Sequence, residues 1–180
     1  GIDSRLLFFG DDGRKVMSFI RNPRPMSEEV MKRRENLRQA ADIFRQLHEC
    51  GEDTGVRFEV FEMAELYERI IRESGIAFYD DYEEVKQTVM EIKASVDSMG
   101  IAPRVPCHND SLIENWVLDE SGKLYLIDWE YSGMNEAMWD LSCLSIEANY
   151  SSEDDDQLLE AYYRRKGSID EKKRFVAAKL

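Results

Sequence analysis

The stretch CHNDSLIEN, residues 107–115, places an imidazole, two amides and two carboxylates in one short segment. His108, Asp110 and Asn115 form the spacing H-x-D-x-x-x-x-N, and a further carboxylate, Asp128, follows the apolar run LYLI. Carboxylate and amide oxygens that leave room for water and phosphate suit Mg²⁺ better than Zn²⁺, which prefers His and Cys ligands. The residues therefore predict a magnesium site, if the fold brings Asp110, Asn115 and Asp128 together.

The segment between Asn115 and Asp128 must position these groups, and its pattern is typical of a β-hairpin. Residues 116–119 and 123–127 flank a turn with the sequence Glu-Ser-Gly. In an antiparallel pairing the numbers of opposed residues then add to about 243, so Asn115 lies opposite Asp128 with Cα atoms on the order of 5 Å apart. Asp110, in the loop before the hairpin, can fold back beside both.

A purely structural reading of this motif also has to be considered. Asn and Asp are common in turns and helix caps, so an isolated H-x-D-x-x-x-x-N pattern often occurs without a catalytic role. Asp128, the carboxylate at the end of the second strand, makes a functional role more plausible than a purely structural one. The predicted hairpin register independently places this residue opposite Asn115. The combination favours a functional site.

Composition limits the classes of protein that are possible. The chain has 180 residues, 43% of them hydrophobic, which is enough for one ordinary core, and it has no apolar run of the roughly 18 residues needed to span a bilayer. A formal charge of −13 argues against a nucleic-acid partner and makes small or cationic ligands easier to accommodate, without selecting a function. The cysteines Cys50, Cys107 and Cys143 form no Cys-x-x-Cys pair, and the N-terminus has no signal-like apolar region. We expect buried thiols and a cytoplasmic protein.

The first part of the chain predicts a hairpin followed by a linker. Two short apolar runs flank the turn GDDG within residues 5–20, which indicates a β-hairpin. Pro23 and Pro25 then disfavour helical residues before them. Ser27, followed by two glutamates, is typical of a helix start.

Three amphipathic helices are predicted next, and each ends close to a glycine. Because each helix has an apolar stripe, we expect the three to pack on one another. The stripe residues are Leu37, Ala41, Phe44 and His48 in the first helix, Val60, Ala64, Tyr67 and Ile71 in the second, and Val85, Val89, Ile92, Val96 and Met99 in the third.

The last part of the chain is also predicted to be helical. Residues 138–149 and 153–166 have helical patterns, and Ser168 with Glu171 has the capping-box spacing of a final helix. Helices therefore dominate, with one hairpin near the N-terminus and one in the middle. The sequence predicts an α+β fold that is mainly α.

These motifs resemble those of the choline/ethanolamine kinase family, and of bacterial choline kinases in particular. HND followed by Asn115, then IDWEYSGMNEAMWDL and an acidic Glu147, is similar to the family pattern. The loop also resembles the protein-kinase sequence H-R-D-x-x-x-x-N, and Asp128 the D-F-G aspartate. The resemblance covers residues 14–165 and is strongest over 105–147. It implies the large lobe of a protein-kinase-like fold in the aminoglycoside-phosphotransferase-like superfamily.

The resemblance implies an enzyme that transfers the γ-phosphoryl group of ATP, with Mg²⁺, to the hydroxyl of choline or a related amino alcohol. Asp110 would orient and deprotonate that hydroxyl. Asn115 and Asp128 would hold magnesium, and Glu130 would help to hold a second ion.

Further residues acquire roles only through the resemblance. His108 would structure the loop rather than carry a proton, and Asp140 would brace the loop. Tyr131, Glu147 and Tyr150 would contact the cationic substrate, because a quaternary ammonium needs carboxylate charge and aromatic faces.

The resemblance also implies two parts of unequal size. Residues 1–24 would be the end of a small lobe with a hinge, where Phe19 and Ile20 contact the nucleotide. Residues 25–180 would be the helical large lobe. The first residues contain neither the glycine-rich turn nor the strand lysine that hold nucleotide phosphates in the family, so we expect a fragment that is inactive alone.

Two other functions stay open. One is an aminoglycoside- or sugar-type small-molecule kinase of the same superfamily, and the other is a non-catalytic helical scaffold. Glu130 and Tyr131 favour choline as the substrate, because aminoglycoside phosphotransferases usually have different residues after the metal-binding aspartate. Leu112, where eukaryotic relatives tend to carry a polar residue, leaves the choice between choline and ethanolamine open, and the oligomeric state is not predicted.

Overall fold

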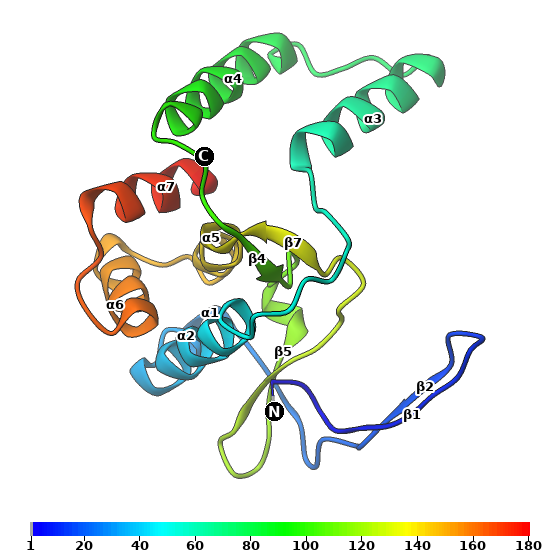
Figure 1. Cartoon of the computed structure of the whole chain (residues 1–180), viewed down its shortest axis with the longest axis vertical. Helices are drawn as coiled ribbons and strands as arrows, with labels where there is room; N and C mark the ends of the chain where they lie inside the picture. Colours follow the sequence, from blue (N-terminus) through cyan, green and yellow to red (C-terminus); the bar gives the residue numbers. More distant parts are fainter. Residues whose placement is uncertain (1) are drawn as a thin grey trace.

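A computed structural model describes residues 2–180 (Figure 1). Strands β1 (Leu6–Phe9) and β2 (Lys15–Met17) form an antiparallel hairpin around the predicted turn, in which Gly13 adopts a φ of 81°. Figure 1 shows this hairpin projecting from the rest of the molecule, and the side chains of β1 are exposed. The hairpin prediction is confirmed.

The first predicted helix is two helices. Helix α1 (Glu28–Met31) starts at Ser27, whose hydroxyl accepts a hydrogen bond from the Val30 amide, and α2 spans Arg34–His48. Between them the backbone of Arg33 is extended, and the side chain of Asn36 donates to the Val30 carbonyl at 2.7 Å. This bond from the Asn36 side chain takes the place of a backbone hydrogen bond that a continuous helix would make to the Val30 carbonyl. The expected continuous helix was therefore wrong, because no Pro or Gly announces the break.

Two small sheets lie in the middle of the chain. Strands β5 (Trp116–Leu118) and β6 (Leu124–Leu126) form the central hairpin, and β3 (Arg24–Pro25) pairs with the free edge of β5. Strand β4 (Arg104–Cys107) pairs antiparallel with β7 (Gly133–Glu136). A 3₁₀ turn, η1 (Ile113–Asn115), leads into β5. The loop between β4 and β5 therefore connects the two sheets.

Helices α5 (Ala137–Glu147), α6 (Ser152–Tyr163) and α7 (Ile169–Lys179) follow. Capping boxes start α6 at Ser151 and α7 at Ser168, and each serine exchanges hydrogen bonds with the acidic residue three positions on. The core lies between α2, the β5–β6 hairpin, α5 and α6, where Phe44 meets Trp116 edge to face at a ring-centroid distance of 5.4 Å. The prediction of a mainly helical α+β fold is confirmed.

Helices α3 (Val60–Glu73) and α4 (Tyr82–Ser98) extend away from this core (Figure 1). Neither contains a buried residue, and they are joined where Glu68 accepts hydrogen bonds from Lys86 and Tyr82. The expectation that the first three predicted helices pack on one another was wrong, because an apolar stripe does not specify its partner. Among residues 2–180 no helix has the length and apolar content that a membrane crossing requires.

The three thiols differ in environment. Cys107 is buried, Cys143 is half-buried, and Cys50 is exposed, so the expectation of three buried thiols was wrong for Cys50. Cys50 follows the last turn of α2, where the chain leaves the core. Burial raises the pKa of Cys143 to about 11, so its thiol is protonated at neutral pH.

Candidate active site

The loop between β4 and β5 brings Asp110 and Asn115 into contact. The amide nitrogen of Asn115 donates to the Asp110 carbonyl at 2.7 Å and to its carboxylate at 3.0 Å. The η1 turn makes this contact possible by turning Asn115 back toward the loop. The side-chain amide oxygen of Asn115 accepts no hydrogen bond from any residue within 2–180.

His108 lies beneath this pair and connects the loop to β6. Its ring is buried, its Nε2 donates to the Ile127 carbonyl at 2.9 Å, and its Nδ1 accepts from the Asp110 amide at 3.3 Å. This pattern fixes one tautomer of the neutral ring. His108 therefore ties the backbone of Asp110 to the residue that precedes Asp128.

The register of the central hairpin differs by one residue from the predicted one. Trp116 pairs with Leu126, and the Ile127 amide donates to the Asn115 carbonyl at 2.9 Å. Ile127, rather than Asp128, thus lies opposite Asn115. Asp128 follows with a left-handed φ of 65°, which ends the strand and turns the chain at the open end of the hairpin.

Asp140 on α5 holds the loop from below. Its two carboxylate oxygens accept from the backbone amides of His108 at 2.8 Å and Asn109 at 2.7 Å. The carboxylate is fully buried, so these bonds and one from His48 Nε2 at 3.0 Å replace the water it has lost. Consecutive amides that converge on one carboxylate give the loop a fixed conformation.

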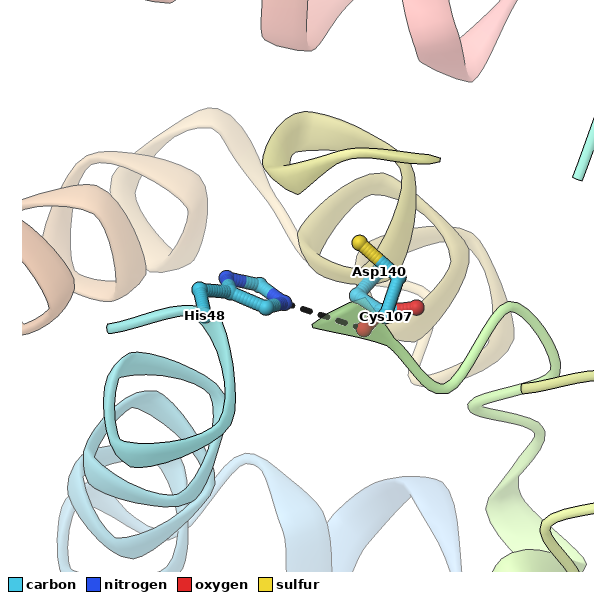
Figure 2. Close-up of side chains that lie close together, drawn as sticks. All are labelled: His48, Cys107 and Asp140. Atoms are coloured by element: carbon cyan, nitrogen blue, oxygen red, sulfur yellow. Dashed lines mark hydrogen bonds and ion pairs between the residues drawn. The ribbon is translucent and has the colours of Figure 1, made fainter. Parts of the chain in front are cut away.

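His48 at the end of α2 extends this network (Figure 2). Its Nε2 donates to Asp140, and its Nδ1 lies 2.8 Å from the hydroxyl of Tyr162 on α6. Burial raises the pKa of Tyr162, so its hydroxyl keeps its proton. Sequence reasoning placed His48 only in an apolar stripe and did not find Tyr162. A histidine in such a stripe was the one available signal.

Cys107 lies beside His48 and Asp140, and the three offer ligand atoms within 4.8 Å of one another (Figure 2). A metal would have to displace the hydrogen bonds that already occupy both oxygens of Asp140. Burial, and then the charge of Asp140, raise the pKa of the Cys107 thiol far above its ordinary value, so a thiolate is disfavoured. This cluster is a hydrogen-bond network rather than a metal site.

The predicted magnesium ligands lie on the open side of the loop. Asp128 and Glu130 are exposed, and no residue of the described chain, 2–180, donates a hydrogen bond to either side chain. Within the same range, Asp110, Asp128 and Glu130 do not bring their oxygens within 4.8 Å of one another. Together with the Asn115 amide oxygen they offer only oxygen donors, which is the ligand type that Mg²⁺ prefers.

The three residues predicted to contact the substrate lie in different environments. Tyr131 is exposed, and Glu147 is half-buried at the end of α5. Tyr150 belongs to the hydrophobic core, and its hydroxyl donates to the Met31 carbonyl at 3.2 Å. The structure thus leaves Tyr131 and Glu147 accessible and gives Tyr150 a partner inside the protein.

Phe19 and Ile20, predicted to contact the nucleotide, line an open groove of about 710 Å³. The groove lies between the segment that follows β2 and the turn of the β5–β6 hairpin, where Asp119 and Tyr125 contribute to its wall. Phe19 is 83% exposed. These two residues lie by the turn of the hairpin, whereas Asn115 and Asp128 lie at its open end.

The comparisons with known proteins identify a family. The family model described as choline/ethanolamine kinase matches residues 1–180, the whole of the chain. The chain belongs to the choline/ethanolamine kinase family. The predicted resemblance to choline/ethanolamine kinases is therefore confirmed.

Individual choline/ethanolamine kinase relatives differ in length from this chain. Protein LicA of Haemophilus influenzae is 29% identical over 150 residues, which are 83% of this chain and 44% of LicA. A choline/ethanolamine kinase family protein from Mesorhizobium loti superposes with a TM-score of 0.88 at 29% identity, over 99% of this chain and 61% of that protein. The choline kinase LicA from Streptococcus pneumoniae gives 0.82 at 28% identity, over 98% and 61%. The chain thus spans about half the length of the curated relatives it matches.

Proposed function

We propose that the protein transfers a phosphoryl group from ATP to the hydroxyl of choline or a related amino alcohol. The observation that carries the proposal is the contact between Asp110 and Asn115 in a loop held by Asp140. Phosphoryl transfer needs little covalent chemistry from the protein and depends on positioned oxygens and cations, which this loop can supply. Family membership favours an amino alcohol as the acceptor.

Within this proposal each polar group of the loop has one task. Asp110 orients the acceptor hydroxyl and takes its proton, because its carboxylate is half-buried beside the open end of the hairpin. Asn115 and Asp128 would hold Mg²⁺, with Glu130 as a further oxygen donor. When bound, the ion neutralises charge on the transferred phosphoryl group. His108 positions Asp110 through its amide and takes no part in proton transfer.

The substrate cation is proposed to lie near Tyr131 and Glu147. A quaternary ammonium cannot donate a hydrogen bond, so an accessible ring and carboxylate are the groups that recognise it. Tyr150 is left out of the proposed site, because its ring and hydroxyl are both engaged in the core. The nucleotide is proposed to contact Phe19 and Ile20. A reducing cytoplasm fits an ATP-using enzyme with three free thiols.

A panel of acceptors tests the substrate class. ADP release by the intact protein, with Mg²⁺ and ATP, should be fast with choline or ethanolamine and slow with kanamycin. Turnover of kanamycin alone would assign the protein to the aminoglycoside type. Turnover of none of the three, by protein shown to bind ATP, would contradict the proposal and favour the scaffold.

A second experiment tests the role of Asp110. Asp110→Asn should lower kcat by on the order of 10²-fold or more, because the acceptor hydroxyl loses its base, while the thermal midpoint stays the same. Glu114→Gln, an exposed carboxylate of the same loop, is the matched control and should keep the wild-type rate. A near-normal kcat in Asp110→Asn would remove Asp110 from the mechanism.

A further inference from the structure

Asn109, the residue between His108 and Asp110, has both polar atoms of its side chain engaged with the segment that follows Asp128. Its side-chain nitrogen donates to the carbonyls of Tyr131 at 2.9 Å and Gly133 at 3.4 Å. Its side-chain oxygen accepts from Asn135 at 3.0 Å. These three bonds cross from the catalytic loop to residues 131–135.

The backbone of Asn109 is held by the start of α5. Its amide donates to Asp140 at 2.7 Å, and its carbonyl accepts from the indole of Trp139 at 3.2 Å. The residue adopts a left-handed φ of 67°, which Asn tolerates better than most residues. Asn109 is 6% exposed, so losing a partner would leave a polar group buried without compensation.

Asn135 continues the connection to β4. Its side-chain oxygen accepts from Arg104 at 3.0 Å and from the Glu136 amide at 2.8 Å, which fixes the direction of its nitrogen toward Asn109. Asn135 is as buried as Asn109. The two amides therefore form a rigid pair rather than an exchangeable surface contact.

We propose that Asn109 is a positioning residue that clamps the segment from Asp128 to Gly133 against the catalytic loop and thereby sets the place of Tyr131 in the substrate site. Its importance for catalysis rests on the proposed function, whereas the clamp itself does not. Trp129 fixes the start of this segment, because its ring packs against His108 at a centroid distance of 4.8 Å and its indole nitrogen donates to the Leu126 carbonyl at 3.2 Å. Asp128 and Tyr131 are exposed and make no side-chain hydrogen bond within residues 2–180, so the place of Tyr131, beyond Trp129, depends on bonds to the backbone. The side chain of Asn109 supplies two of those bonds.

Two substitutions separate the side chain from the backbone. Asn109→Gly keeps the left-handed backbone and its bonds to Asp140 and Trp139 but removes all three side-chain bonds. Asn109→Asp keeps the size and an acceptor for Asn135, yet it cannot donate to the carbonyls of Tyr131 and Gly133. Asn149→Gly is the control, because Asn149 is exposed, has a left-handed φ of 49°, and makes no side-chain hydrogen bond to a residue within 2–180.

The experiment measures amide hydrogen exchange of the intact protein together with its kinetics. In both Asn109 variants the protected amides within residues 130–133, such as that of Ser132, which donates to the Trp129 carbonyl at 3.1 Å, should exchange at least roughly tenfold faster, because the turn opens more often once its carbonyls lose the bonds from Asn109. The amides of α2 and α6 should keep the wild-type rates. The KM for the amino alcohol should rise roughly threefold or more from misplacement of the substrate site. Asn149→Gly should change neither quantity.

Two results would overturn the clamp. One is unchanged exchange at residues 130–133 in both Asn109 variants. The other is a lowered thermal midpoint with uniformly faster exchange and an unchanged KM, which a merely structural residue would give. If the wild-type protein phosphorylates no amino alcohol, the proposed function fails, and local exchange at residues 130–133 still decides whether the clamp exists.

Discussion

Tyr162 and Tyr163 are neighbours on α6, but their hydroxyls have different partners. The Tyr162 hydroxyl is hydrogen-bonded to the buried Nδ1 of His48 at 2.8 Å, whereas the Tyr163 hydroxyl reaches only the sulfur of Met138 at 3.8 Å. Sulfur is a weak acceptor, and a buried ring nitrogen without a hydrogen-bond partner is costly. The two residues therefore provide a matched pair for measuring the network beneath the loop.

We predict that Tyr162→Phe lowers the free energy of unfolding by about 1–3 kcal/mol, because it leaves His48 Nδ1 buried without a hydrogen-bond partner. Tyr163→Phe should cost less than ~0.5 kcal/mol. Urea denaturation followed by circular dichroism measures both. Equal effects of the two substitutions would show that the hydrogen bond to His48 contributes nothing of its own.

A second prediction concerns Glu147. Glu147→Gln should raise the KM for choline, since a carboxylate near the cation is lost, and leave the KM for ATP unchanged. Glu160→Gln, an exposed carboxylate of α6, serves as the control and should alter neither constant. Equal changes in both KM values, or none, would remove Glu147 from the substrate site.

Sequence spacing located the part of the site whose contacts are local. The bond from Asn115 to Asp110 spans five positions, which a loop motif can encode. The bond from His48 to Asp140 spans 92 positions and depends on how α2 packs against α5. No spacing within a single segment contains that information, so His48 and Tyr162 could be found only in the folded chain.

At the scale of elements, the start of α7 shows how a cap and an ion pair combine. Glu171 completes the capping box with Ser168 and accepts from both terminal nitrogens of the Arg165 guanidinium, at 2.9 and 2.6 Å. Arg165, and then the bonds from Ser168, lower the pKa of Glu171 from 4.5 to about 2 against the effect of burial. The carboxylate therefore stabilises the folded state only while it is ionised.

We predict that Glu171→Gln lowers the free energy of unfolding by about 0.2–1 kcal/mol at pH 7, since Gln keeps the cap but loses an ion pair whose Arg165 partner is largely exposed. The folded-state pKa is depressed, so the difference from wild type is fully present above pH 4.5 and shrinks as the pH falls toward about 2. Urea titrations across this range measure it. Asp170→Asn, exposed in the same helical turn, is the control, and a difference independent of pH would contradict the assignment.

Helical periodicity predicted α3 and α4, helical patterns predicted α5 and α6, and the capping-box spacing of Ser168 and Glu171 predicted α7. The break between α1 and α2 was not predictable, since it depends on Asn36 reaching the Val30 carbonyl rather than on a helix-breaking residue. The predicted hairpin register was wrong by one position, although the turn was predicted correctly. The pairing of Trp116 with Leu126 is set by packing in the core, which the sequence pattern does not show. Local patterns thus gave the elements, and tertiary contacts decided their ends and register.

At the scale of the whole molecule, α3 and α4 differ from the other long helices in having no buried residue. Apolar side chains of both remain half exposed or more, including Tyr67 at 53% and Val85 at 52%. Helices in globular proteins draw most of their stability from a packed apolar face. Tertiary packing therefore stabilises these two helices less than it stabilises α2 or α5.

We predict that, in the 180-residue chain, amides of residues 60–98 exchange at least about tenfold faster than those of α2 and α5, because they open locally without disturbing the core. Hydrogen exchange with mass-spectrometric detection measures the difference. Exchange in α2 serves as the internal reference. Equal protection of both regions would show that the apolar faces of α3 and α4 are covered in solution.

The buried carboxylate of Asp140 also limits how the protein can change over evolutionary time. It joins α5 to the end of α2 and to the loop after β4, segments that are far apart in the gene. Replacing Asp140 alone would leave a buried histidine and two backbone amides without a hydrogen-bond acceptor. Replacing His48 alone would remove one of the hydrogen bonds that stabilise the buried carboxylate. A recombinant that takes residues up to the end of α2 from a relative without this histidine would contain Asp140 without His48. We expect such recombinants to fold stably only when the two segments together supply both His48 and Asp140.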